Sequence, residues 1–434
     1  MEFLLWLLCF DGVISRRRIR KTGWKRNNRE GERTTMRYSI ATNWDFDLLE
    51  RLEGTSVQSL YGQMWNDPLG GGRMALFIPK VGKTEVASFI AEARKRGLSF
   101  NYLINATCFD NLEFTKRGYR KIADHVDWIS SIGVDMVTVA LPFLLEMVKR
   151  EFPNLKVCVS SFARIQNIHL ARYWEDLGAQ KIILPESIGR DFRTLRSIRE
   201  AVGCELELIA NHCCLFQCPL DLHHRNMVSH GSQEGHPCGG FAPDYCKLAC
   251  QRLKLFRPAE LIKSRWIRPE DVSDYEVMGI DCLKLIERFR GTESLVQIMN
   301  AYERKSYKGN LVELLSLPQQ GAFLAPNMEV LQRTDLIEPE KMEEAMEVLK
   351  EPFPGKVFID NSKLNGFLDY FKKTDCFHTD CNRCGYCEQM ASKAVSIDED
   401  WRKEMISRFE KAIDILITGE IAGLGPSPLR PFPV

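Results

Sequence analysis

Several features that would fix a function class at once are missing from this 434-residue sequence. The apolar run at residues 3–10 is far too short to cross a bilayer, since a spanning helix needs about 20 residues. The zinc-protease pattern His-Glu-x-x-His does not occur. The net charge is only +1, which gives no overall attraction to nucleic acid or to an anionic membrane. We therefore expect a protein with no membrane partner.

The N-terminal segment also lacks the layout of a secretion signal. Its positive charge follows the apolar run, whereas a signal peptide carries positive charge before its apolar core. Met36 begins a stretch that looks like the start of a domain. We expect residues 1–35 to be a disordered or spurious leader and the protein to be cytoplasmic.

Short β-branched runs alternate with amphipathic stretches from Arg37 to about residue 300. This alternation predicts parallel strands joined by crossover helices. The expected strands are Tyr38–Thr42, Val57–Tyr61, Phe100–Asn105, Met136–Leu141, Lys156–Ser160, Lys181–Leu184, Glu205–Ala210 and Leu261–Trp266. The expected helices are Lys83–Lys95, Lys116–Ser131, Phe143–Glu151, Ile165–Leu177, Asp191–Ala201, Pro269–Gly279 and Cys282–Arg290.

Eight strand–helix units in this length match a TIM-type (β/α)8 barrel, which takes about 250 residues. A doubly wound open sheet is the alternative, but the first strand–helix turn lacks the dinucleotide-binding glycine pattern. We place the barrel at residues 36–305 and a C-terminal, cysteine-rich extension at residues 306–434. Within the extension, Pro339–Leu349 and Trp401–Leu416 are expected to be helices.

Ten of the 15 cysteines fall in two short regions, which favours metal binding over disulfides in a long chain without a signal peptide. The first group follows the seventh expected strand and contains Cys213, Cys214, Cys218, Cys238, Cys246 and Cys250. Two pairs in it have Cys-x3-Cys spacing. Four thiolates suit a cubane iron–sulfur cluster or a tetrahedral zinc ion. The carboxyl end of a barrel strand is where this fold carries its active site.

The second group, Cys376, Cys381, Cys384 and Cys387, lies in the extension. Its Cys-x2-Cys-x2-Cys core is the compact run that binds a cubane in bacterial ferredoxins. Zinc ribbons normally use two separated Cys-x2-Cys pairs, so zinc is the alternative here. Five isolated cysteines, Cys9, Cys108, Cys158, Cys204 and Cys282, lie in apolar contexts and are expected to be core residues.

Around the first group the sequence resembles peptidase family U32, the collagenase-like family. Three segments carry the resemblance: "NHCC" after strand seven, "YCKLACQRLKL", and "LIKSRWIRPEDVSDYEVMGIDCLKLIERFRGTESLVQIMNAYERKSY". The resemblance covers roughly residues 37–310. It implies a TIM-type barrel and a 4Fe–4S cluster held by Cys214 or Cys213, Cys218, Cys246 and Cys250. It also implies oxygen-independent hydroxylation, with prephenate as oxygen donor.

The resemblance carries over further residues and shows departures. Lys284 and Arg288 keep the spacing of the family's Lys-Ile-Glu-Gly-Arg signature, but Ile286 and Glu287 stand where Glu and Gly are expected. With Lys284 and Arg288, we expect Asn211 and His212, beside the cysteines, to be catalytic. Cationic side chains that could hold a dicarboxylate are Arg164, Lys263, Arg265 and Arg268.

Three functions remain open at this point. The leading hypothesis is an iron–sulfur enzyme that hydroxylates, or otherwise modifies, a small molecule, RNA or peptide. The second is a collagenase-like peptidase with zinc or a cysteine nucleophile. The third is a non-catalytic iron–sulfur subunit, because family members can act in pairs; a heterodimer partner or an electron donor is then expected.

Overall fold

The computed structural model describes residues 35–237, 243–288, 290–318 and 336–424. The predicted leader and Cys238 therefore lie outside the described residues, apart from residue 35. Residues 33–434 form one compact unit. Within the described part of the chain, no helix is both long enough and apolar enough to cross a membrane.

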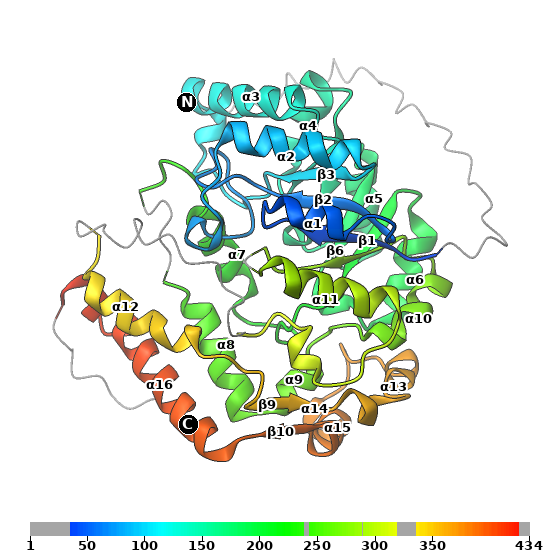
Figure 1. The fold of residues 1–434 in the computed structure, drawn as a ribbon, viewed down its shortest axis with the longest axis vertical. Coiled ribbons are helices and arrows are strands. Elements are labelled where there is room, and N and C mark those ends of the chain that lie inside the picture. Colours follow the sequence, from blue (N-terminus) through cyan, green and yellow to red (C-terminus); the bar gives the residue numbers. More distant parts are fainter. Residues whose placement is uncertain (1–34, 238–242, 289, 319–335, 425–434) are drawn as a thin grey trace, which may run out of the picture. The chain divides into compact units, whose positions relative to one another are not determined.

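Eight parallel strands form a closed barrel in sequence order, and helices surround it (Figure 1). The strands are β1 (Arg37–Ala41), β2 (Val57–Gly62), β3 (Ser99–Leu103), β4 (Met136–Val139), β5 (Lys156–Val159), β6 (Lys181–Leu184), β7 (Glu205–Ile209) and β8 (Cys282–Leu285). Closure is made by β1 and β8, where Arg37 pairs with Cys282 and Ile40 with Leu285. The predicted TIM-type barrel is confirmed.

The connecting helices bury an apolar face against the barrel, which explains their periodic sequence pattern. They are α1 (Phe46–Arg51), α2 (Lys83–Lys95), α3 (Lys116–Ser131), α4 (Pro142–Glu151), α5 (Ile168–Asp176), α6 (Phe192–Ala201) and α11 (Thr292–Glu303). Side chains cap several of them at the N-terminus: Thr115 accepts from the Gly118 amide and Asp191 from the Thr194 amide.

The eighth strand is not where the sequence predicted it. Leu261–Trp266 is not a strand; the structure has α9 (Ala259–Lys263) there, and β8 (Cys282–Leu285) occupies part of a predicted helix. Both segments are short and mix apolar with charged residues, and segments this short do not reveal by periodicity whether they form helix or strand. The connection from β7 to β8 is correspondingly long and carries α7 (Asp221–His230), α8 (Tyr245–Phe256), α9 and α10 (Val272–Met278).

The C-terminal extension packs against this long connection. It contains α12 (Pro339–Glu347), β9 (Val357–Ile359), α13 (Leu368–Lys373), α14 (Cys381–Cys384), α15 (Tyr386–Ala394), β10 (Val395–Ile397) and α16 (Glu399–Ile417). Strands β9 and β10 pair antiparallel. Helix α16 runs beside α8 (Figure 1), and α15 packs on α9.

Arg402 of α16 donates to the Leu255 carbonyl at 2.7 Å and to the Phe256 carbonyl at 3.2 Å. These are carbonyls at the end of α8, which have no partner within the helix. The extension thus holds the helix that carries Cys246 and Cys250.

Candidate functional site

Three cysteines of the first group meet at the carboxyl end of β7. Cys214 and Cys218 lie in the loop after this strand, and Cys250 lies on α8. A hydrogen bond between the Cys214 thiol and the Cys218 sulfur raises the pKa of Cys214 and lowers the pKa of Cys218. Burial raises the pKa of Cys250 to about 11, and Cys214 adds to this shift. The structure thereby brings together thiols from both predicted pairs.

A buried lysine stands among these thiols. The Lys254 ammonium donates to the Cys213 carbonyl at 2.6 Å and lies 4.0 Å from the Cys250 sulfur. Burial disfavours its charge, yet the surrounding cysteines raise the pKa of Lys254 overall. A buried cation is costly unless it has an anionic partner. The buried Lys254 ammonium therefore favours negative charge on the surrounding cysteine sulfurs.

The other two described cysteines of this group are placed differently. The Cys213 thiol is buried in the hydrophobic core and contacts the Ser264 hydroxyl. Cys246 precedes Cys250 by one helical turn and is also buried. Its pKa is raised to about 12, by burial and then by Asp244 and Cys250. Cys246 thus stands beside Cys250 as a fourth thiol, and Cys213 is turned toward the core.

A polar pocket opens next to the thiols, over the carboxyl ends of β5, β6 and β7. Its lining residues are Arg164, Gln166, Glu186, Ser187, Cys214, Leu215, Gln217, Cys218, Asp221, Arg225 and Arg265. Arg225 reaches Glu186 at 3.3 Å and Asp221 at 2.6 Å. Arg164 also pairs with Asp221, at 3.1 Å.

Arg265 differs from the other two pocket arginines. It is only 5% exposed, and its Nε and Nη1 atoms have no hydrogen-bond partner among the residues that the structure describes. Its guanidinium lies 3.7 Å from the centre of the Phe216 ring. Buried donors without a partner are rare and costly, so Arg265 is the pocket cation most available to an anionic ligand.

His212 and Glu186 form a pair at the pocket edge. His212 Nδ1 lies 2.6 Å from a Glu186 oxygen. Burial works against both charges, but their attraction prevails: the pKa of His212 is raised and the pKa of Glu186 is lowered. The raised pKa favours the protonated form of His212, a predicted site residue, and the Glu186 carboxylate holds its ring in place. No sequence spacing links Glu186 to His212, so the sequence alone did not predict this pair.

The other predicted catalytic residues lie away from the pocket lining. The Asn211 side chain is fully buried and bonds to the backbone of Ile286 and Leu314. Lys284 lies in the barrel interior with its ammonium 3.1 Å from the centre of the Tyr61 ring, and burial lowers its pKa to about 8. Arg288 donates to Gln63 at 2.9 Å.

Glu287 occupies the position where the family signature has glycine, and its backbone shows why glycine suits it. Its φ is 122°, a conformation that side chains other than glycine rarely adopt. The Glu287 carboxylate pairs with Arg73 at 3.0 Å. Strained residues of this kind persist where the surrounding structure holds them, often at functional sites.

The four cysteines of the second group line one pocket. Cys376, Cys381, Cys384 and Cys387 share it with Phe216, Lys263, Arg265, Tyr370, Phe371, Thr379 and Glu388. Arg265 therefore lines both pockets. The Tyr370 hydroxyl lies 3.0 Å from the Cys384 sulfur.

Cations surround the second group as well. Burial raises the pKa of Cys387 to about 11, while Arg190 and Arg265 oppose that shift. Burial also raises the pKa of Cys381, and Lys263 opposes that shift. Gly385, at φ 63°, joins α14 to α15 and lets the chain turn between Cys384 and Cys387.

The chemistry of the two cysteine groups bears on the kind of metal centre they could hold. A cubane iron–sulfur cluster is held by four cysteine thiolates, one on each iron. Four thiols around one pocket, with cations in its wall, fit an anionic iron–sulfur cluster.

The cationic side chains that were predicted to hold a dicarboxylate do not all lie in one place. Arg164 and Arg265 line the first pocket, and Lys263 lines the second. Arg268 lines neither and pairs with Asp271 at 2.7 Å. Of the isolated cysteines, Cys158 and Cys282 are buried as predicted.

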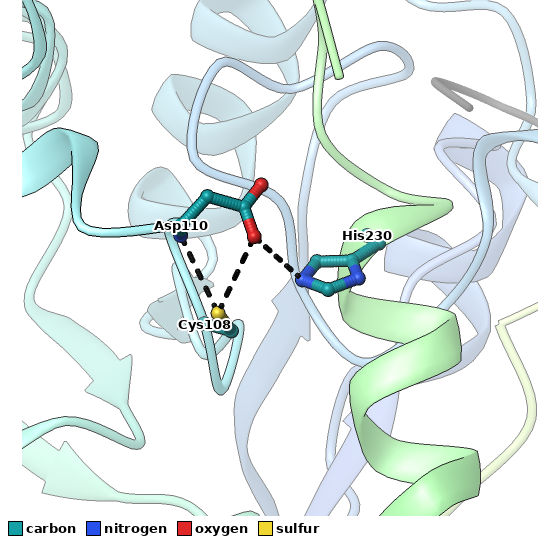
Figure 2. Close-up of side chains that lie close together, drawn as sticks. All are labelled: Cys108, Asp110 and His230. Atoms are coloured by element: carbon teal, nitrogen blue, oxygen red, sulfur yellow. Dashed lines mark hydrogen bonds and ion pairs between the residues drawn. The ribbon is translucent and has the colours of Figure 1, made fainter. Parts of the chain in front are cut away.

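Cys108 is not a core residue. It is half-buried, and its sulfur lies beside Asp110 and His230 (Figure 2). The sequence prediction missed this group because its members come from distant parts of the chain.

Part of the chain is similar to known proteins. The model of peptidase family U32 matches residues 77–235, from the segment before α2 to just beyond α7. An uncharacterized protease of Methanocaldococcus jannaschii is 28% identical over 333 residues, covering 76% of this chain and 86% of that protein. A solved U32 peptidase structure is 23% identical, with a TM-score of 0.45, and covers 58% of this chain and 94% of its own. The matched segment contains β3 to β7 and Cys213, Cys214 and Cys218, so this part of the chain is similar to peptidase family U32.

Proposed function

We propose that this chain is an iron–sulfur enzyme that carries out an oxygen-independent hydroxylation or a related modification. The observation that carries the proposal is the meeting of Cys214, Cys218 and Cys250 around buried Lys254, next to a pocket with three arginines. Cys246 supplies the fourth thiol. The bound cluster would supply electron transfer at this position.

The residues around the pocket can bind an acidic reactant and move a proton. In a hydroxylation without dioxygen, the oxygen must come from a donor: R–H + R′–OH gives R–OH + R′–H. A dicarboxylate donor such as prephenate would be held by Arg265 and Arg164, because guanidinium groups bind carboxylates bidentately. His212, whose pKa is raised by the neighbouring Glu186 carboxylate, is suited to give a proton to the departing donor.

We propose a second cluster on Cys376, Cys381, Cys384 and Cys387. The four cysteines line one pocket together with Lys263 and Arg265, and these cationic side chains suit an anionic cluster. Arg265 and Phe216 stand in the wall of the second pocket, and Arg265 also lines the first. The second cluster would pass electrons from a donor protein, or from a partner subunit, to bring the first cluster into its active oxidation state, since the exchange of the hydroxyl group itself consumes none. This arrangement explains why both cysteine groups border one buried arginine.

Metal analysis of anaerobically purified protein tests both clusters. We expect a brown protein with about eight iron atoms per chain, and a paramagnetic resonance signal from each cluster after reduction. A colourless protein that holds zinc in both cysteine groups would contradict the proposal. Product analysis with a labelled hydroxyl donor, under nitrogen, then tests the reaction class.

A peptidase is the second candidate, because the Methanocaldococcus jannaschii relative is described as a protease. A zinc protease would use an open metal position and a general base. Cleavage of peptides by protein freed of iron would favour this candidate. Loss of all activity on iron removal, restored by reconstitution, would exclude it.

A further inference from the structure

A third group of metal-ligating side chains lies outside both cysteine groups. Cys108 and Asp110 are in the loop between β3 and α3, and His230 is the last residue of α7 (Figure 2). Their ligand atoms all lie within 4.8 Å of one another. In the described ranges of the chain, no other set of histidine, cysteine and acidic side chains gathers so closely.

The spacing of these atoms matches a zinc coordination sphere. Asp110 Oδ1 lies 3.6 Å from the Cys108 sulfur and 3.5 Å from His230 Nε2. Zinc bonds of about 2.0–2.3 Å in a tetrahedron place ligand atoms about 3.3–3.8 Å apart. Thiolate, imidazole and carboxylate together are ligands of zinc and similar transition metals, whereas magnesium and calcium prefer oxygen.

One ligand atom lacks the partner it needs. His230 Nε2 is buried and makes no hydrogen bond, since the Asp110 oxygen lies at ion-pair distance only. A thiol–carboxylate hydrogen bond would account for Cys108 and Asp110. It leaves the His230 nitrogen unexplained, and buried polar atoms in this state need a reason.

His236 lies next to this group, although it is outside the set whose ligand atoms are all within 4.8 Å of one another. His236 Nε2 lies 3.3 Å from Asp110 Oδ2, and its ring stacks on that of His230 with centres 4.5 Å apart. Gln233 donates to the Cys108 carbonyl at 2.8 Å, which ties the two loops together. Outer contacts of this kind orient metal ligands.

We propose that Cys108, Asp110 and His230, with His236 as the fourth ligand, bind one zinc-type divalent ion. The ion would fasten the β3–α3 loop to the end of α7. That helix also carries Arg225, which pairs with Glu186 in the pocket. The ion would therefore hold one wall of the pocket in place. The site shares no ligand with either cysteine group, so it stands whether or not those groups bind clusters.

The test measures zinc and iron per chain after the anaerobically prepared full-length protein is equilibrated with zinc and freed of excess metal. We expect one zinc more in the wild type than in Cys108→Ser, Asp110→Asn or His230→Gln, with the same iron content in all four. The matched control is His223→Gln, an exposed histidine on the same helix, which should keep the full zinc content.

Cobalt gives an independent readout. We expect cobalt to add visible ligand-field absorption and a sulfur-to-cobalt band to the wild type, and Cys108→Ser to lose the sulfur band. Asp110 is 44% exposed, so Asp110→Asn should fold even where a buried variant does not. Equal zinc contents in the wild type and in folded Asp110→Asn and Cys108→Ser would overturn the proposal. A change in iron alone would concern the clusters and not this site.

Discussion

The barrel's cysteine group and the extension's cysteine group border the same arginine, Arg265, but in different surroundings. The barrel group encloses the buried Lys254, and its members Cys213 and Cys246 are almost fully buried, while Cys214, Cys218 and Cys250 are half-buried. All four cysteines of the extension are half-buried. A metal centre inside the barrel is shielded and close to a reactant pocket, whereas one nearer the surface is accessible to a redox partner. Under the proposed function, this difference favours chemistry at the first group and electron entry at the second.

The largest expected effect comes from removing ligands of one group at a time. Cys214→Ser/Cys250→Ser should lose about four irons and all activity, because the site beside the pocket is emptied. Cys381→Ser/Cys384→Ser should also lose about four irons, but should keep activity when a strong chemical reductant is supplied. Iron analysis and turnover measure both. Cys204→Ser, outside both groups, is the control.

Equal loss of activity in the two double variants, with chemical reductant present, would contradict this division of roles between the two cysteine groups. It would mean that the extension's group also takes part in the reaction, or that α8 and the extension do not keep their packing without it. Thermal unfolding of each variant separates these two outcomes.

Much of this comparison was visible in the sequence, and the reason is local spacing. The Cys-x3-Cys and Cys-x2-Cys-x2-Cys patterns place thiols together within a turn or loop, so tertiary structure adds little to them. The first seven strands were also predicted to within about two residues at either end, since apolar runs between amphipathic helices mark them. β8 was missed because its four residues, which include Lys284, run into a charged stretch and together look like a helix start.

Contacts between distant segments could not be predicted in this way. Glu186 follows β6 and His212 follows β7, and only barrel closure brings their side chains to 2.6 Å. Cys108 and His230 are brought together by the packing of α7 on the β3–α3 loop. No spacing in a single sequence records such meetings, because each depends on the register of strands and on where a long connection folds back.

Thiol reactivity sharpens the comparison in metal-free protein. Contact with Cys214 lowers the pKa of Cys218, whereas burial raises the pKa of Cys387 to about 11. The thiolate is the reactive form, so at neutral pH iodoacetamide should modify Cys218 at least about tenfold faster than Cys387. Peptide mass spectrometry over a time course measures both rates.

The labelling rates of the two cysteines should also depend differently on pH. Labelling of Cys387 should rise steadily as the pH approaches about 11, because its thiolate fraction grows over that range. Labelling of Cys218 should level off at lower pH. Similar pH curves for the two cysteines would show that the barrel thiols are not distinguished by their surroundings.

Replacing the buried lysine tests the electrostatic part of the comparison. Lys254→Met removes a positive charge 4.0 Å from the Cys250 sulfur and should make the barrel cluster harder to reduce. We expect its potential to fall by about 60 mV, a tenfold change in the one-electron equilibrium. The potential of the extension's cluster should not move. Potentiometric titration followed by paramagnetic resonance resolves the two signals, and a shift in both would contradict this prediction.

The smallest effect concerns the joint between α14 and α15. Gly385 has φ 63° and no atom within 4 Å of the place where a Cβ would stand, so Gly385→Ala adds backbone strain without a clash. The cost is about 1 kcal/mol, or about fivefold in the population with all four thiols in position. Asparagine tolerates a positive φ better than alanine does, so the strain in Gly385→Asn should lie between that of the wild type and that of Gly385→Ala. Iron retained after mild chelation should rank glycine, asparagine, alanine in the extension's cluster while the barrel's cluster stays constant. The ranking isolates backbone geometry from ligand chemistry, because every cysteine is present in all three proteins.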